Sequence, residues 1–176
     1  MTLRRAAAVL GGALLLAGCG GDDDKPSEAP PEAKESITLS SSAFRDGGTI
    51  PTRYTCSGAE RSPPLSWSGV PDDAAELTLL VEDPDAGNFV HWKLLGLPPA
   101  ATGVEEGPKS SPAKGSGGDW TGPCPPEGDD PHRYVFSIYA TDELLKLDDD
   151  TSIDDVHSAL EDHSIARGTL TGRYGR

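Results

Sequence analysis

The sequence predicts a mainly β domain of the β-rich α+β class, on three observations. The 16 prolines and 21 glycines are spread through the chain and divide it into short elements. Apolar runs typical of strands recur, and in the clearest, 133–140, Tyr134, Phe136 and Ile138 fall on one face. Only the segment that follows Thr151 and ends before Gly168 has a firm helical pattern.

Four other segments are predicted to form strands. The apolar run 77–81 ends at an Asp-Pro-Asp turn, and a second run is stopped by Pro98 and Pro99. Between the strands, 47–71 is rich in turn residues and 100–130 is a long Gly/Ser/Pro loop. The four predicted strands are 37–39, 77–81, 89–97 and 169–174.

The predicted helix begins after Thr151 or Ser152, either of which can cap it. Aspartates occupy its first turn, where the helix dipole favours anions, and Gly168 follows its end. A second short helix is expected around 142–146, so the fold has one or two helices, both in the C-terminal half. The residues that repeat at helical spacing are Ile153, Val156 and Leu160.

The N-terminus has the layout of an export signal. Two arginines precede an apolar run of about 12 residues, too short to span a bilayer as a helix. Leu-Ala-Gly-Cys closes this run and resembles the lipobox of bacterial lipoproteins, which predicts an acylated Cys19 in place of an ordinary signal peptide that contains a cysteine. We therefore expect a lipoprotein signal peptide at 1–18, a disordered tether at 19–36 and a folded domain at 37–176.

This organisation predicts an exported protein, lipid-anchored (by palmitate or a similar acyl chain) to the extracytoplasmic side of the membrane. The Arg4-Arg5 pair is also compatible with twin-arginine export, so the route stays open. The formal net charge is −14, and it becomes −16 without residues 1–18, which carry two arginines and no acid. Such a charge argues against nucleic acid as a partner and against a basic surface that docks on membranes.

Cys56 and Cys124 remain once Cys19 is assigned to lipid. In an oxidising compartment an even pair favours a disulfide, and two buried free thiols are the alternative.

Three polar stretches could carry chemistry: 82–86 with His91 close behind, 117–128, and 131–136. Each has a simpler structural interpretation as a turn, a core histidine or a surface loop. Together, two histidines, a carboxylate and the backbone amides of a glycine-containing loop could form a compact pocket for an anion.

These stretches resemble the phosphatidylethanolamine-binding protein family, in particular its bacterial Raf-kinase-inhibitor-like branch. The resemblance covers about 37–174 and keeps the family's order of motifs. It implies an antiparallel β-sandwich with a small pocket for phosphate-like or carboxylate anions. The matching segments are 43–44, 50–51, 54–58, 62–67, 83–86, 91–92, 122–126 and 131–134.

The resemblance also implies which residues line the pocket. By this correspondence they are Asp83, His91, Gly122, Pro123, His132 and Tyr134.

The sequence departs from the family at two positions near the pocket. Gly87 stands where the family has proline after Asp-Pro-Asp-Ala, which predicts a more mobile rim. Trp120 stands where the bacterial branch has tyrosine, which replaces a hydroxyl by an indole N–H and puts headgroup selectivity in doubt.

The leading hypothesis is a binding module for a small anionic ligand such as a phosphate, a carboxylate or a phospholipid headgroup. It has no catalytic residues, metal or cofactor, and the resemblance also allows an inhibited protein partner. The first alternative is a metal-dependent enzyme that uses His91, His132 and Asp83, since two histidines and a carboxylate can hold a metal. The second is an envelope interaction protein with a vestigial pocket.

Overall fold

The structure is a computed structural model that describes residues 35–107 and 116–176. The predicted signal peptide, Cys19 and all but the last two residues of the predicted tether lie outside these ranges. Glu35 and Ser36, which the sequence assigned to the tether, pair with a strand near the C-terminus.

The described elements follow one another as β1 (Glu35–Ser36), β2 (Thr38–Ser40), β3 (Gly48–Thr49), η1 (Thr52–Tyr54), β4 (Leu65–Ser68), β5 (Glu76–Asp83), η2 (Pro84–Ala86), β6 (Phe89–Leu97), β7 (Gly103–Val104), β8 (Ser116–Gly117), β9 (His132–Thr141), α1 (Ile153–His163) and β10 (Ser164–Tyr174).

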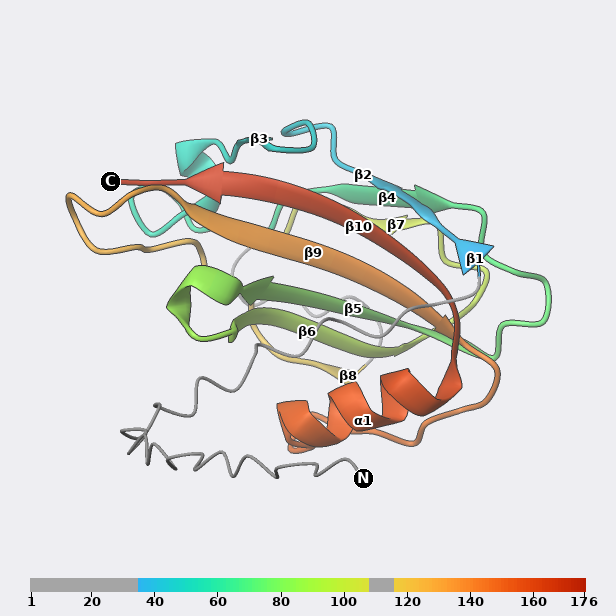
Figure 1. The fold of residues 1–176 in the computed structure, drawn as a ribbon. Helices are drawn as coiled ribbons and strands as arrows, with labels where there is room; N and C mark the ends of the chain where they lie inside the picture. Colours follow the sequence, from blue (N-terminus) through green and yellow to red (C-terminus); the bar gives the residue numbers. More distant parts are fainter. Residues whose placement is uncertain (1–34, 108–115) are drawn as a thin grey trace, which may run out of the picture.

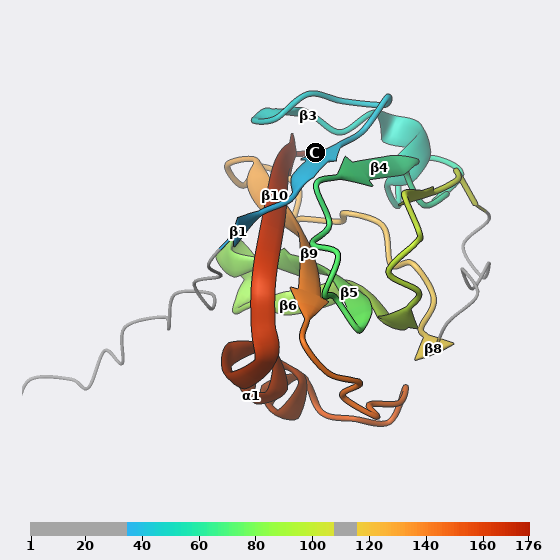
Figure 2. The same ribbon diagram turned by 90° about the vertical axis from the view of Figure 1, so that its right-hand side faces the viewer.

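Two β-sheets pack face to face, and a helix covers the outer side of the larger one. Within the described residues, the larger sheet has the order β1-β10-β9-β5-β6-β8 with β3 also beside β10, and the smaller has the order β2-β4-β7. Neighbouring strands are antiparallel, except that β1 and β3 each run parallel to β10. Figure 1 shows the smaller sheet above and α1 below the larger sheet, and Figure 2 gives the side view. The predicted mainly β sandwich is confirmed.

Burial follows this layering. β5 is almost entirely buried, since one of its faces meets the smaller sheet and the other meets α1. The main core lies between the sheets and includes Trp67, which the sequence left in a turn-rich segment and which lies on β4. A second, smaller core lies under α1. Its buried members are Leu80, Leu95, Tyr139, Val156 and Leu160.

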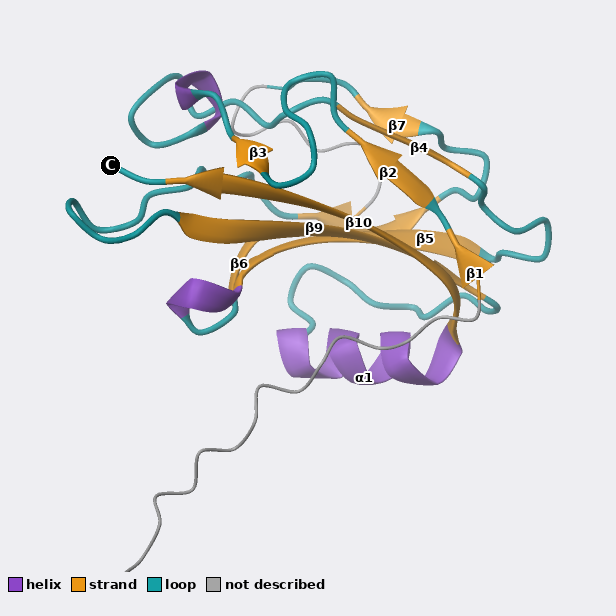
Figure 3. Cartoon of the chain, turned by 45° about the horizontal axis from the view of Figure 1, so that its top comes forward, coloured by secondary structure: helices purple, strands orange, loops and turns teal. Residues whose placement is uncertain are grey.

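The helix begins where the sequence predicts and ends earlier. Ser152 is its N-cap, and the Ser152 hydroxyl accepts a hydrogen bond from Asp155 N at 3.2 Å. α1 ends at His163 and β10 starts at Ser164, so the expected helical stretch before Gly168 is strand (Figure 3).

The second helix expected at 142–146 is wrong, because this segment forms bends and irregular backbone. Its backbone groups form hydrogen bonds with neighbouring side chains instead of with one another. Leu145 N donates to Glu76 Oε1 at 3.2 Å, and the Thr141 hydroxyl donates to Glu143 O at 2.8 Å.

The Cys56–Cys124 disulfide is present, with 5.5 Å between the two Cα atoms. It joins the segment after η1 to the Gly-Pro loop before β9.

Candidate functional site

Asp83 ends β5 and is held by the turn that follows it. Its Oδ1 accepts hydrogen bonds from Asp85 N at 2.9 Å and Ala86 N at 3.1 Å, which caps η2. The side chain is buried, at 2% exposure for the residue. The Asp-Pro-Asp stretch is therefore a turn, as its composition suggests, and the turn fixes the direction of the Asp83 carboxylate.

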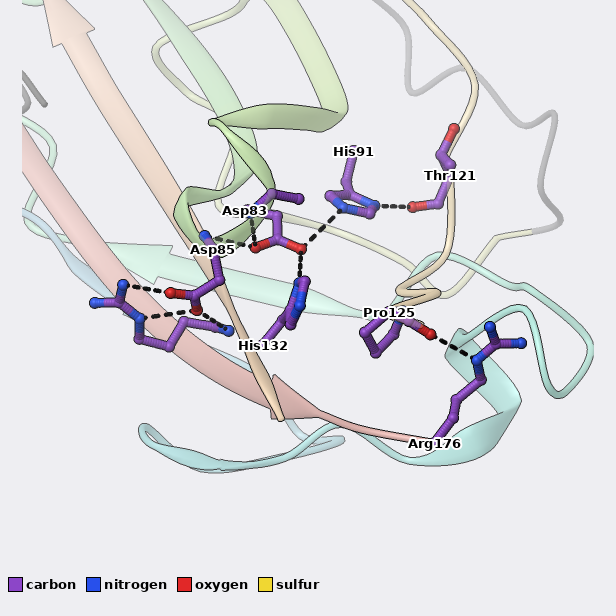
Figure 4. Close-up of polar contacts among 9 residues, drawn as sticks. Asp83, Asp85, His91, Thr121, Pro125, His132 and Arg176 are labelled. Carbon is purple, nitrogen blue, oxygen red and sulfur yellow. Dashed lines mark hydrogen bonds and ion pairs between the residues drawn. The ribbon is translucent and has the colours of Figure 1, made fainter. Parts of the chain in front are cut away.

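The other oxygen of Asp83 faces His132, the first residue of β9. His132 Nδ1 lies 2.8 Å from Asp83 Oδ2 (Figure 4). A carboxylate can only accept, so Nδ1 carries the hydrogen and Nε2 is left for another partner. No residue in 35–107 or 116–176 bonds that Nε2.

A β-bulge brings His91 to the same place. Val81 pairs with Trp92 but Glu82 pairs with Val90, so β6 has one extra residue, His91, at this point. A bulge lets consecutive side chains turn to one side of a sheet, and His91 and Trp92 are both buried. His91 thereby contacts the core aromatics instead of the outer face.

His91 is oriented by a backbone carbonyl. Its Nδ1 donates to Thr121 O at 2.7 Å, and its Nε2 lies 4.0 Å from Asp83 Oδ2 (Figure 4). Burial lowers the pKa of His91, and the Thr121 carbonyl and the Asp83 charge offset only part of this effect. His91 is therefore the neutral, fixed histidine of the pair.

Tyr134 places a buried hydroxyl beside this group. Its ring meets that of His91 edge to face, with 5.0 Å between centroids. The hydroxyl makes no hydrogen bond within the described part of the chain. Burial and then the Asp83 charge raise the pKa of Tyr134, so the hydroxyl stays protonated and can donate. The Asp83 carboxylate is the nearby acceptor, but no hydrogen bond to it is formed. A buried donor left in this state is costly, and a bound ligand or water would relieve it.

The Gly-Pro loop borders the site but its amides are engaged elsewhere. Gly122 N donates to Glu60 Oε1 at 3.1 Å and Thr121 N donates to His91 O at 2.9 Å, while Pro123 has no N–H. Gly122 and Pro123 are buried and offer no free backbone donor to the site.

The two positions at which the sequence departs from the family, Trp120 and Gly87, have different structural settings. Trp120 is buried and its Nε1 donates to Tyr54 O at 3.1 Å, so its indole N–H is used in the core. Gly87 has φ of 66°, which proline cannot adopt because its ring holds φ near −65°. The turn after Asp-Pro-Asp-Ala therefore has its own backbone course in this chain.

Sequence reasoning missed three contributors to the site. Thr121 orients His91 and Glu60 holds Gly122, and both act through groups that no motif marks. Arg133 grips Asp85 with Nε at 3.0 Å and Nη2 at 2.7 Å, an ion pair that lowers the pKa of Asp85 to about 2. Asp85 lies in the polar stretch 82–86 and Arg133 in the polar stretch 131–136. Their presence in these stretches was the sequence signal that could have indicated the ion pair.

The family model of the phosphatidylethanolamine-binding protein matches residues 40–175. The chain belongs to this family. A UPF0098 protein of Methanothermobacter thermautotrophicus is 41% identical over 152 residues, which cover 80% of this chain and 99% of that protein. LppC of Mycobacterium tuberculosis, which is named as a lipoprotein, is 37% identical over 154 residues. These residues cover 82% of this chain and 75% of LppC.

Solved structures of family members have the same fold. The phosphatidylethanolamine-binding protein homologue CT736 of Chlamydia trachomatis is 35% identical with a TM-score of 0.73, over 81% of this chain and 99% of that one. YbcL of E. coli, described as a member of the mammalian family, is 26% identical with a TM-score of 0.72. The match covers 80% of this chain and 98% of YbcL.

The histidines do not form a ready metal site. Asp83 Oδ2 hydrogen-bonds His132 directly, and His91 Nδ1 is occupied by Thr121. Within 35–107 and 116–176 no three His, Cys, Asp or Glu side chains are grouped to hold a metal ion. In the same part of the chain, no helix has the length and apolar character needed to cross a membrane.

Proposed function

We propose that this protein is a membrane-tethered domain that binds a small anionic group, such as a phosphate, a carboxylate or a phospholipid headgroup, at Asp83, His91, His132 and Tyr134. The observation that carries the proposal is the buried Tyr134 hydroxyl, which lies beside the Asp83–His132 pair and makes no hydrogen bond within residues 35–107 and 116–176. Membership of a family named for phosphatidylethanolamine binding supports the ligand class.

The Asp83 carboxylate is compatible with an anion site because protein hydrogen-bond donors already compensate its negative charge. Asp83 accepts two backbone N–H groups and the Nδ1–H of His132, so its charge is spread over three donors. The Nδ1–H of His132 is used on Asp83, so Nε2 is the ring atom left for the ligand. In a protonated imidazole this nitrogen also carries a hydrogen and can donate to an anion.

The tether follows from the N-terminal sequence and from a relative. The motif Leu-Ala-Gly-Cys supports an acylated N-terminus at Cys19 on the extracytoplasmic side of the membrane. The name of LppC, a lipoprotein, supports the same anchor in this chain. An inhibitory role toward a protein partner would use the same pocket. The role that we propose for the site is binding, and we assign it no catalytic residue.

The test is calorimetric titration with inorganic phosphate, acetate and glycerophosphoethanolamine. Tyr134→Phe should weaken phosphate binding about tenfold, since it removes one hydrogen bond to a charged group. Tyr139→Phe is the matched control, because Tyr139 is equally buried but packs under α1. Stronger binding of glycerophosphoethanolamine than of phosphate would identify a lipid headgroup as the ligand, and equal affinities would point to a free anion.

Equal phosphate affinities of the Tyr134→Phe and wild-type proteins would overturn the assignment of this site. Stoichiometric zinc or iron that is lost in His91→Ala and His132→Ala variants would favour the metal-dependent alternative.

A further inference from the structure

A short segment connects the disulfide to His91. Residues 120–124, here called the strap, run along β6, where Thr121 N donates to His91 O and Thr121 O accepts from His91 Nδ1. The carbonyl of Thr121 decides which ring nitrogen of His91 carries the hydrogen. Any shift of the strap therefore changes the orientation and tautomer of His91.

On its other side the strap is fastened to residues 54–60, here called the Cys56 segment. Cys56 N donates to Pro123 O at 3.2 Å, and the Cys56–Cys124 disulfide closes the same junction covalently. Gly122 lies so close to Thr55 that an added Cβ would come within 3.0 Å of the Thr55 Cα. The strap thus has little freedom while the disulfide is intact.

Glu60 supplies the last fastening. Its carboxylate accepts from Gly122 N, and its backbone has φ of 52°, a left-handed conformation that is uncommon for residues other than glycine. A strained residue of this kind persists only where its surroundings hold it, and such residues cluster at ligand sites. The segment that holds the strap is therefore itself held in a costly conformation.

The disulfide is open to exchange with a thiol. Cys124 is an exposed residue and Cys56 a half-buried one, so the disulfide lies at the protein surface and not in the core. Exposed disulfides are the ones that serve as labile or regulatory bonds.

We propose that the Cys56–Cys124 disulfide positions His91 through the strap and so makes the anion site sensitive to thiol redox state; this inference rests on the proposed anion-binding function. A dithiol supplies the electrons. One of its thiolates attacks Cys124 Sγ, the S–S bond breaks, and Cys56 leaves as a thiolate that takes up a proton. The second thiol then releases Cys124 as a thiol, and the dithiol ends as a cyclic disulfide, oxidised by two electrons.

The experiment compares oxidised protein with protein reduced by dithiothreitol, using the full chain. Nitrogen-15 NMR of the His91 ring reports its tautomer, which a purely structural disulfide would leave unchanged. On reduction we expect the signals to lose the fixed Nδ1–H form and phosphate affinity to fall about fivefold, the effect of one weakened hydrogen bond. The Cys56→Ser/Cys124→Ser double variant should behave like the reduced protein.

Two further variants separate positioning from general stability. Glu60→Gln should shift the His91 signals in the same direction with the disulfide intact. Val156→Ala loosens the small core under α1, away from the strap, and should change neither the His91 signals nor phosphate affinity. An effect of Val156→Ala as large as that of reduction would overturn the proposal.

The remaining outcomes are distinct. If the oxidised wild type binds phosphate and reduction changes neither its affinity nor the His91 tautomer, redox control is wrong and the proposed function stands. If the oxidised wild type does not bind phosphate at all, the proposed function is wrong and redox control of it falls as well.

Discussion

At the scale of single residues, the Asp83 carboxylate organises the candidate site through both of its oxygens. One oxygen caps η2 and the other receives the Nδ1–H of His132. Asn has only one oxygen, so its NH2 group would face either the His132 Nδ1–H or the two backbone N–H groups of η2, unless the His132 ring changes tautomer. One carboxylate thus links the turn after β5 to His132 at the start of β9.

Asp83→Asn should therefore weaken phosphate binding by about tenfold and lower the free energy of unfolding by about 1–3 kcal/mol, the cost of disturbing a buried hydrogen-bonded group. Calorimetric titration and urea unfolding measure the two effects. Asp73→Asn, at an exposed turn, serves as the control and should change neither. Wild-type affinity in Asp83→Asn would contradict the role given to this carboxylate.

His91 should contribute little to the pH dependence of binding. Burial lowers the pKa of His91, which favours the neutral ring as pH falls. Sulfate is the suitable probe, because its own charge is constant between pH 8 and pH 5. Titrations in this range should show the same change of sulfate affinity with pH in wild type and in His91→Gln. A pH dependence that is present in wild type and lost in His91→Gln would refute the neutral state of this ring.

Residue-scale chemistry was the part of the site that sequence predicted least completely. Motifs named Asp83, His91 and His132, but the bulge that turns His91 inward arises from strand register, which no local pattern encodes. Thr121 acts through its carbonyl, and any residue could supply a carbonyl.

At the scale of elements, one ion pair joins the helix to the sheet. His157 Nε2 on α1 lies 3.0 Å from Glu82 Oε1 on β5. Hydrogen bonding to Glu82 raises the pKa of His157 against the opposing effect of burial, and Arg167 lowers it slightly while Asp154 raises it. The protonated form is thus the one that the folded state favours.

The sign of the pH effect follows from that shift. A histidine with a raised folded-state pKa contributes stability that is complete below its unfolded pKa, about 6.5, and is lost as pH rises through the folded value. Urea unfolding of wild type and His157→Gln should differ more at pH 5.5 than at pH 8.5. Because the pair is partly exposed, the extra difference should stay below about 1 kcal/mol. Glu82→Gln should abolish it, and a larger difference at pH 8.5 would contradict the ion pair.

Sequence predicted the elements well where local signals were strong. Ser152 marked the start of α1, and Pro98 marked the end of β6 at Leu97. Sequence-based prediction failed where tertiary contacts determine the structure. β10 already starts at Ser164, because this residue pairs with Thr141 of β9. The second helix is absent from 142–146 because the amide of Leu145, which a helix would need, donates to the Glu76 side chain.

At the scale of the whole molecule, the disulfide closes a loop of 68 residues between the smaller sheet's side and the rim of the site. Closing a loop of that length removes chain entropy from the unfolded state, which corresponds to about 4 kcal/mol in the simple entropic treatment. Folded domains have a free energy of unfolding of about 5–15 kcal/mol, so the reduced protein should be less stable but still folded.

Cys56→Ser/Cys124→Ser should therefore lower the free energy of unfolding by about 4 kcal/mol while circular dichroism keeps the β signature. Dithiothreitol should reproduce the loss in wild type and add nothing to the double variant. A loss below about 1 kcal/mol, or a double variant that is unfolded, would contradict this entropic estimate.

The overall sandwich could be predicted because many motifs occur in the family's order along nearly the whole chain. The pairing of β1 and β3 with β10 could not, since two-residue strands carry no pattern of their own and depend on the neighbour that receives them. For the same reason the folded part reaches back to Glu35, into the predicted tether.

The measurement that tests the anion pocket most directly is an NMR titration of the oxidised chain with phosphate at constant ionic strength, following the imidazole signals of His91 and His132. We predict saturable shifts at both rings with one dissociation constant, reduced in Tyr134→Phe and retained in Tyr139→Phe. Signals at both rings that remain unchanged up to high phosphate concentration would contradict the pocket and leave the family fold without this function.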